Sequence, residues 1–295
     1  MPERILVTGA GGFLGRAVLR LARTHWPSAE VVAVGHRTLP AGGPAIAVDL
    51  TAPEAQVTLS GRWDLIVHVA ANIPTGAGAG RLAGLRDNLR MAETLLAVCE
   101  RAPPKRLVMA SSISVYPMGA APVLHEGLAP CPDTPYGVGK LAAEHVLGVV
   151  RSFGTRVAIL RLSSLYGPGQ SAMSVLRLFL DRALAGSPLR LFGDGGRTQD
   201  FLHVEDAARG LVAAAGADGV FNLGSGEATS MAELARLITA LPACRGSAIE
   251  FTATPDPSPS VRLDIGRAWA AFGYRPHIAL TSGLEDYCHA LLQRL

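Results

Sequence analysis

A glycine-rich turn near the N-terminus limits the possible folds of this chain more than any other feature. The apolar run at residues 4–8 predicts a strand, and apolar residues recur at helical spacing from residue 13 onward. A strand that turns on glycines into a helix presents free backbone N–H groups and a positive helix end to an anion. The pattern predicts a dinucleotide pyrophosphate site, and the alternative is a turn that is only tightly packed. The residues of this predicted site are Gly9, Gly12, Phe13, Leu14 and Gly15.

Apolar segments alternate with helical segments through the first half of the chain. Near-continuous apolar strands between helices are typical of a parallel sheet that is covered on both faces. The predicted fold class is therefore α/β, a Rossmann-type doubly wound parallel sheet with a smaller C-terminal α/β substrate domain. The predicted strands lie at residues 31–34, 45–48, 65–69, 107–110 and 157–160, and the predicted helices at 85–99 and 136–153.

The second half of the chain is less regular, and we predict that it forms the substrate side. Residues 1–163 are assigned to a dinucleotide-binding Rossmann domain and residues 164–295 mainly to a substrate-binding domain. Within the latter, the segment 201–224 is expected to return to the Rossmann domain. Two capping boxes, beginning at Ser230 and Ser282, predict helix starts.

Composition excludes several classes of protein. At 49% hydrophobic residues the chain can bury a large core, but no apolar run is long enough to cross a membrane. The first strand begins too early to leave room for a signal peptide. Four scattered cysteines without a C-x-x-C pair indicate a reduced, cytoplasmic protein without a metal site. A net charge of +3 with dispersed arginines argues against nucleic acid as a partner.

The residues about twenty positions beyond the glycine turn indicate which dinucleotide binds. An acidic residue there would bind the ribose 2′-hydroxyl of NAD, but no Asp or Glu lies between Glu30 and Asp49. His36 and Arg37 stand there instead, and a cation suits the 2′-phosphate of NADP. We therefore predict NADP, with NAD as the alternative. Asp49 and the following Leu50 are expected along the adenine, although Asp49 can equally form a turn.

Tyr136 and Lys140 open a predicted helix and lie one turn apart on the same face. A free tyrosine has a pKa near 10, too high for a base at neutral pH, and a neighbouring ammonium would lower that pKa. The chain has two lysines among its 27 basic residues, so this spacing does not follow from a lysine-rich composition. Ser112 ends the fifth predicted strand, where its hydroxyl could orient a substrate oxygen near the phenol, although the serines of this segment taken alone are better explained as caps of a turn.

Together with further blocks in the same order, these features resemble the extended short-chain dehydrogenase/reductase family, also called the NAD-dependent epimerase/dehydratase family. The resemblance extends nearly from end to end of the chain. The further blocks are His68–Ala71, Asn88, Arg161–Pro168, Gly193–Gly195, Asp200–Val204 and Asn222–Gly226.

The resemblance implies roles for individual residues. Ser112, Tyr136 and Lys140 would form the catalytic triad. Tyr136 and Lys140 would also contact the cofactor, and Ala70, Ala71 and Asn88 would lie along it. The helices that contain Asn88 and Lys140 would form the interface of a homodimer.

Departures from the family pattern concern the substrate. Family members that bind nucleotide sugars usually carry Asn where this chain has Ser164, and Arg where it has Gln199. Arg197 lies two residues before Gln199. A later Arg that clamps the diphosphate in the family has no clear match near Pro257, where Arg262 could substitute for it. The residues expected to line the substrate site are Asn72, Ser114, Ser164, Arg197, Gln199 and Arg262. Dehydratases carry an Asp-Glu pair where this chain has Ile113 and Ser114, so dehydration is not expected.

Three functional hypotheses follow from these observations. The first is an NADP-dependent ketoreductase that acts on a keto-sugar, which can be nucleotide-linked, with Tyr136 donating the proton and Ser112 orienting the carbonyl. The second is an NAD-dependent nucleotide-sugar epimerase, which retains its cofactor through oxidation and reduction. The third, a dinucleotide sensor without catalysis, is disfavoured because the Tyr136/Lys140 pair is intact.

Overall fold

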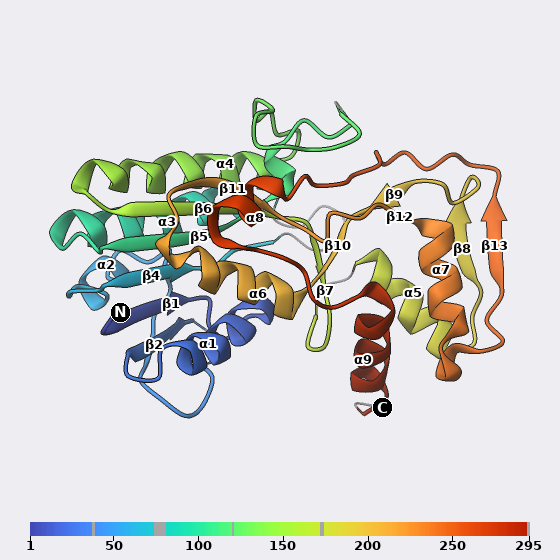
Figure 1. Ribbon diagram of the computed structural model, residues 1–295, viewed down its shortest axis with the longest axis horizontal. Helices are drawn as coiled ribbons and strands as arrows, with labels where there is room; N and C mark the ends of the chain where they lie inside the picture. Colours follow the sequence, from blue (N-terminus) through green and yellow to red (C-terminus); the bar gives the residue numbers. More distant parts are fainter. Residues whose placement is uncertain (37–38, 74–80, 120, 172–173, 294–295) are drawn as a thin grey trace.

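The computed structural model describes residues 1–36, 39–73, 81–119, 121–171 and 174–293 (Figure 1). Its centre is a seven-stranded parallel sheet with the strand order β11-β6-β5-β4-β1-β2-β3. The predicted doubly wound α/β fold is confirmed. The strands of this sheet are β1 (Arg4–Thr8), β2 (Glu30–Gly35), β3 (Ala45–Ala47), β4 (Leu65–His68), β5 (Arg106–Ser112), β6 (Arg156–Leu162) and β11 (Gly219–Leu223).

Helices cover both faces of this sheet. One layer contains α1 (Phe13–His25), α6 (Val204–Ala213) and α8 (Gly266–Phe272), and the other contains α2 (Ala55–Thr58), α3 (Arg81–Arg101) and α4 (Pro135–Gly148). Successive side chains of a strand point to opposite faces, so Ile5 and Val7 join the core under α1 while Leu6 joins the core under α3. No helix in the described ranges is both long and apolar enough to span a membrane.

Most elements after residue 163 surround a third core, at the opposite end of the molecule from β1 and β2 (Figure 1). Here α5 (Val175–Leu184), α7 (Met231–Ala240) and α9 (Leu280–Leu292) bury Leu176, Leu234 and Leu284. The exceptions include β11, which pairs with β6 in the central sheet, and α6 and α8, which pack against that sheet. The boundary at residue 163 stays a prediction. Three two-stranded sheets complete this part: β7 (Ser164–Tyr166) with β10 (Phe201–His203), β8 (Leu189–Phe192) with β13 (Ile249–Thr252), and β9 (Thr198–Gln199) with β12 (Thr229–Ser230).

The two predicted capping boxes have different outcomes. The hydroxyl of Ser230 accepts a hydrogen bond from the Glu233 N–H at 3.1 Å, and α7 begins at the next residue. The prediction at Ser282 is wrong, because α9 begins two residues earlier and the Ser282 hydroxyl donates to the Ala279 carbonyl at 3.0 Å. A serine in the first turn can bond backwards to a carbonyl instead of capping the helix.

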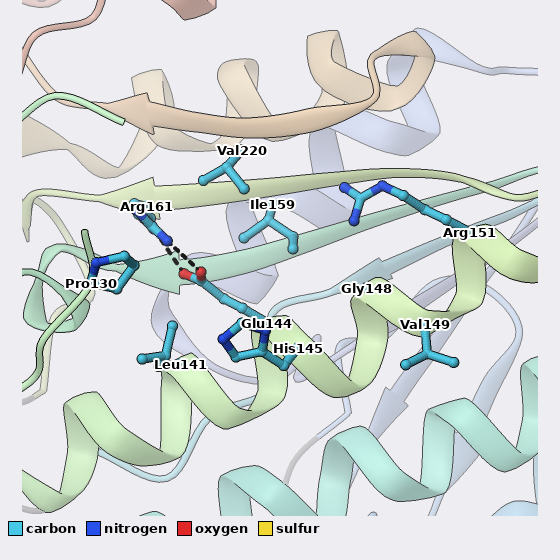
Figure 2. Close-up of a pocket in the computed structure, with 10 residues that line it drawn as sticks. All are labelled: Pro130, Leu141, Glu144, His145, Gly148, Val149, Arg151, Ile159, Arg161 and Val220. Carbon is cyan, nitrogen blue, oxygen red and sulfur yellow. Dashed lines mark hydrogen bonds and ion pairs between the residues drawn. The ribbon is translucent and has the colours of Figure 1, made fainter. Parts of the chain in front are cut away.

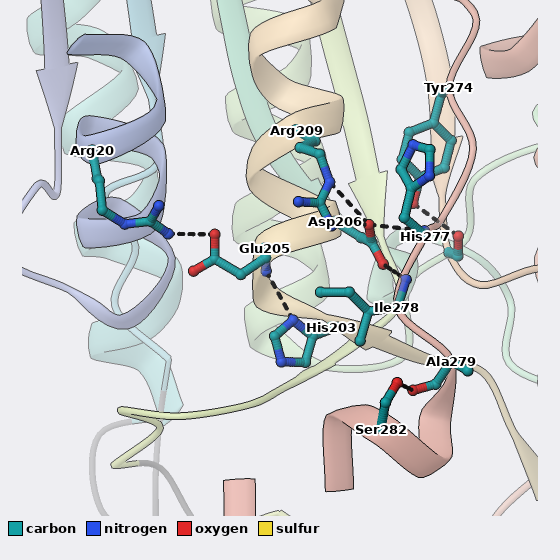
Figure 3. A network of polar contacts seen from close by, with 11 residues as sticks. Arg20, His203, Glu205, Asp206, Arg209, Tyr274, His277, Ile278, Ala279 and Ser282 are labelled. Atoms are coloured by element: carbon teal, nitrogen blue, oxygen red, sulfur yellow. Dashed lines mark hydrogen bonds and ion pairs between the residues drawn. The ribbon is translucent and has the colours of Figure 1, made fainter. Parts of the chain in front are cut away.

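A buried carboxylate fastens the segment before α9 to α6 (Figure 3). Asp206, which is fully buried, accepts hydrogen bonds from the backbone N–H groups of His277 and Ile278 at 3.0 and 2.9 Å. Arg209, one turn along α6, donates to the same carboxylate at 2.7 Å. An anion can be buried at low cost only when it is paired and hydrogen-bonded, and Asp206 meets both conditions.

We predict that Asp206→Ala lowers the free energy of unfolding by about 3 kcal/mol, because two backbone N–H groups and the Arg209 guanidinium lose the buried carboxylate that binds them. Urea denaturation followed by circular dichroism would measure the loss. Glu250→Ala is the control, since its ion pair with Arg190 is exposed and should be worth less than about 1 kcal/mol. Equal losses for the two variants would contradict this account of Asp206.

Candidate active site

The glycine turn forms a close junction between β1, α1 and β4. Gly9 has a φ of +66°, in the left-handed region that favours glycine. The turn is closed by a hydrogen bond of 2.9 Å from the Gly12 N–H to the Gly9 carbonyl. A Cβ atom at Gly9 would lie 2.6 Å from the backbone of Ala70, and one at Gly15 would lie 1.9 Å from the Gly9 carbonyl. Only glycine therefore allows this approach of the backbone.

The first turn of α1 is open to an anion. Gly12 is its N-cap and has no side chain to satisfy the free N–H groups, and the first turn carries no acidic residue. The predicted contacts Phe13 and Leu14 are the first residues of the helix. This cradle fits the pyrophosphate of a dinucleotide, for which free N–H groups and the helix dipole are suited.

The end of the sheet beyond β2 carries a carboxylate. Asp49 lies 3.6 Å from the ring of His36 and accepts hydrogen bonds from the N–H and hydroxyl of Thr51 at 2.9 and 2.8 Å. The carbonyl of the predicted adenine neighbour Leu50 accepts a hydrogen bond from Thr94 of α3. Arg37, on which the NADP prediction depends most, lies outside the described residues. The structure therefore places His36 and Asp49 together at this edge and does not describe the predicted cation.

The segment after β4 is fixed by α3. The Asn88 side chain, on α3, accepts from the Asn72 N–H and donates to the Asn72 carbonyl, both at 3.0 Å. It also donates to the Gly84 carbonyl at 2.6 Å. Ala70 lies against the glycine turn, and Ala71 links it to Asn72. The amide of Asn88 thus holds the segment that the resemblance places along the cofactor.

The first turn of α4 lies tightly against the end of β5. Thr134 caps this helix by accepting the Gly137 N–H at 3.1 Å, and Tyr136 follows the proline that opens it. A Cβ atom at Gly137 would lie 2.1 Å from the carbonyl of Ser114, so the glycine permits this contact. The Ser112 hydroxyl donates to the Ser114 hydroxyl at 3.1 Å and accepts the Ser114 N–H at 3.1 Å.

Lys140 is buried, and its ammonium donates to the carbonyl of Ala110, in β5, at 2.6 Å. Burial disfavours the charged form and lowers the pKa of Lys140 to about 8, while the carboxylate of Glu144 opposes this shift. Desolvation likewise raises the pKa of Tyr136 to about 12, against an opposing interaction with Ser112. The sequence predicted a depressed pKa for Tyr136, whereas burial raises this pKa and Ser112, not Lys140, provides the opposing interaction.

His68, at the end of β4, adds no charge to this site. Its ring is buried and lies 2.8 Å from the Thr8 hydroxyl through Nδ1. Burial and the nearby cation of Lys140 lower the pKa of His68 to about 3, so the imidazole is neutral at physiological pH. No cluster of His, Cys, Asp and Glu side chains within the described ranges is arranged to hold a metal ion.

A buried ion pair beside Lys140 was not anticipated from the sequence. Glu144 lies one turn further along α4. Its carboxylate accepts hydrogen bonds from Nε and Nη2 of Arg161, in β6, at 3.1 and 2.7 Å (Figure 2). The Ser111 hydroxyl also donates to Glu144. The signal that could have revealed this carboxylate is its i+4 spacing from Lys140. The pair lines a cavity of about 410 Å³ beside α4.

Three of the predicted substrate residues form one connected group. Gln199 donates to the Ser164 hydroxyl, and Arg197 donates to the Gln199 side-chain oxygen at 3.1 Å. Arg197 also forms an ion pair of 2.8 Å with Asp256, and both side chains are mostly buried. Asp256 lies in a distant proline-rich loop, and no sequence signal linked it to this group.

The other predicted substrate residues lie elsewhere. The side-chain amide of Asn72 donates to the carboxylate of Asp87, in α3, at 2.7 Å. The Ser114 N–H donates to the Ser112 hydroxyl. Arg262 is exposed, and its carbonyl accepts the Leu124 N–H at 2.8 Å. The structure thus gathers Ser164, Arg197 and Gln199 and leaves the remaining predicted residues in separate surroundings.

A doubly wound sheet with a glycine turn at the carboxyl end of β1 is typical of dinucleotide-binding α/β proteins. The model of the NAD dependent epimerase/dehydratase family matches residues 5–224. The chain belongs to this family, and the predicted resemblance is confirmed.

Individual relatives match over nearly the whole chain. The dTDP-L-rhamnose 4-epimerase of Burkholderia thailandensis is 26% identical over 99% of this chain and 96% of its own length. The solved structure of MoeE5 in complex with UDP-glucose and NAD is 30% identical, with a TM-score of 0.86 and 99% of each chain covered. UDP-glucuronic acid 4-epimerase from Bacillus cereus, in complex with UDP-glucuronic acid and NAD, is 27% identical with the same TM-score, covering 99% of this chain and all of its own.

We predict that Gly15→Ala weakens dinucleotide binding at least about tenfold, because the added methyl group meets the Gly9 carbonyl that shapes the cradle. Isothermal titration calorimetry with NAD and NADP would measure the change. Gly216→Ala is the matched control, since its methyl group would enter open space. Unchanged affinity in a folded Gly15→Ala protein would contradict the assignment of the cradle.

Proposed function

We propose that this protein is an NAD-dependent epimerase of a nucleotide sugar and that Ser112, Tyr136 and Lys140 carry its chemistry. The observation that carries the proposal is the full-length likeness to MoeE5 and to the Bacillus cereus epimerase, both solved with NAD and a UDP-sugar. Ser112 ends β5, Tyr136 and Lys140 lie in the first half of α4, and Lys140 binds the Ala110 carbonyl of β5, which supports the proposal. This likeness favours the epimerase alternative over the ketoreductase that the sequence had suggested first.

The choice of NAD over NADP is also supported by charge. Asp49 lies 3.6 Å from His36 at the edge where the adenosine would lie. A carboxylate accepts hydrogen bonds from neutral groups of the adenosine but repels a 2′-phosphate. His36 and Arg37 by themselves predict NADP. The negative charge of Asp49 favours NAD instead.

In the proposed reaction Tyr136 moves the proton of the sugar hydroxyl and Ser112 orients the oxygen that carries it. When bound, NAD would take up and return the hydride and would bring a positive charge close to the phenol. Tyr136 requires such help, because burial raises its pKa to about 12 and its phenolate is therefore unfavourable at neutral pH. The interaction with Ser112 lowers the pKa of Tyr136, and we propose that the ammonium of Lys140, one turn away, adds to this effect.

The substrate group of Ser164, Gln199 and Arg197 would face the sugar nucleotide. Arg197 already has a carboxylate partner in Asp256, so a diphosphate would have to compete with that carboxylate for the guanidinium. This arrangement differs from a free arginine clamp and is consistent with the departures in the sequence. Homodimer formation through α3 and α4 and a cytoplasmic location stay predictions.

One observation favours the ketoreductase as the second candidate. A phenol whose pKa is about 12 stays protonated at neutral pH, which suits a proton donor to a ketone. A reductase consumes its cofactor with each turnover, whereas an epimerase returns it to the starting state. The fate of the cofactor therefore distinguishes the two candidates.

We expect the purified protein to release NAD upon denaturation and to interconvert 4-epimers of a UDP- or dTDP-sugar without net change in absorbance at 340 nm. Chromatography of the released dinucleotide and of the sugar nucleotides would measure both results. The absence of bound dinucleotide, together with stoichiometric NADPH consumption by a keto-sugar, would replace the epimerase with the ketoreductase.

We predict that Tyr136→Phe lowers kcat by about 10³-fold, because the proton carrier is lost, while NAD affinity changes little. Steady-state kinetics and calorimetry would provide the two measurements. Tyr274→Phe is the control, since it removes another buried hydroxyl, bonded to the Gly224 carbonyl at 2.9 Å, away from the triad. Turnover by Tyr136→Phe at the parent rate would remove Tyr136 from the mechanism.

A further inference from the structure

The carboxylate of Glu144 connects three elements around the candidate triad. Its side chain is about 5% exposed and binds Arg161 of β6 through two guanidinium nitrogens (Figure 2). The same carboxylate accepts the hydroxyl proton of Ser111 in β5. Glu144 itself belongs to α4, one turn beyond Lys140.

The end of β5 is therefore held by two successive residues. The carbonyl of Ala110 accepts the Lys140 ammonium at 2.6 Å, and the hydroxyl of Ser111 bonds to Glu144. Ser112 is the next residue of the strand. Two α4 side chains one turn apart, Lys140 and Glu144, thus prevent α4 from sliding along β5. They thereby set the position of Ser112 relative to Tyr136.

Arg161 is held rigidly from the other side. Its guanidinium carbon lies 4.7 Å from the centre of the Tyr116 ring, a cation–π distance. The Tyr116 hydroxyl donates to the side-chain oxygen of Asn222, in β11, at 2.7 Å. The ion pair is consequently braced by three neighbouring strands of the sheet.

We propose that Glu144, held by Arg161, is a positioning residue that sets the carboxyl end of β5 and the side chain of Lys140 against Tyr136. This inference rests on the proposed role of the triad. A buried ion pair is commonly no more stabilising than an apolar pair of the same volume. Stability alone therefore does not explain a charged pair at this position. The need to hold Ser112 and Lys140 in place relative to Tyr136 does explain it.

The charge of Glu144 also acts on Lys140. The ionisable groups around that ammonium are Tyr136 and Glu144 on α4, His68 on β4 and Arg161 on β6. His68 is neutral, and the protonated phenol of Tyr136 carries no charge, so the carboxylate of Glu144 is the group that favours the ammonium. Removing this carboxylate will lower the pKa of Lys140 further below its ordinary value.

The sequence offers a direct measurement, because Lys105 and Lys140 are its two lysines. Lys105→Arg keeps the cation beside Asp64 and leaves Lys140 as the single lysine for ¹³Cε-lysine NMR. In this background we expect Glu144→Gln to lower the pKa of Lys140 by about one unit. Glu144→Asp keeps the charge and should leave the pKa within about 0.3 units of the parent value.

A second comparison separates positioning from stability. Glu144→Gln leaves the buried Arg161 cation unpaired, so the double variant Glu144→Gln/Arg161→Met serves as the folded neutral form of the pair. We expect it to regain the parent Tm while kcat stays at least about tenfold low with KM little changed. Recovery of kcat together with Tm, or an unchanged Lys140 pKa in folded Glu144→Gln, would overturn the inference. The NMR titration needs no substrate, so it tests the effect of Glu144 on Lys140 even if the epimerase proposal fails.

Discussion

The close contact between α4 and the carboxyl end of β5 is the constraint on which the candidate site depends. Gly137 lets the first turn of the helix approach the Ser114 carbonyl, and Lys140 and Glu144 bind Ala110 and Ser111 in turn. A helix fastened at three levels cannot slide along the strand without breaking buried polar contacts, each of which is costly to lose. The relative positions of the triad side chains follow from this fastening.

Burial shifts the two ionisable groups of the site in opposite directions. The phenol of Tyr136 is driven toward a pKa of about 12 and the ammonium of Lys140 toward about 8, because each loses solvation of its charged form. The site therefore disfavours both the phenolate and the ammonium. Glu144 partly restores the ammonium, and the binding of a positively charged ring would act on the phenolate. In the proposed reaction, the ligands would supply the missing charge.

The substrate side is organised by a different set of contacts. Arg197, Gln199 and Ser164 form a hydrogen-bonded chain that ends in the ion pair with Asp256. A carboxylate already bound to the guanidinium changes what an anionic substrate gains from Arg197, since it must replace an existing partner. The departures from the family pattern are thus parts of one local arrangement and not independent losses.

The sequence by itself determined the order of strands and helices, the glycine cradle and the Tyr136/Lys140 pair, because each depends on residues close together in the chain. The local pattern at Ser282 gave a wrong helix start. The helix begins at Leu280, and the Ser282 hydroxyl donates to the Ala279 carbonyl. Only the tertiary structure brought Arg161 to Glu144 and Asp256 to Arg197, since these partners are distant in sequence. It also decided the pKa of Tyr136, because desolvation depends on what surrounds a side chain and not on its neighbours in the chain.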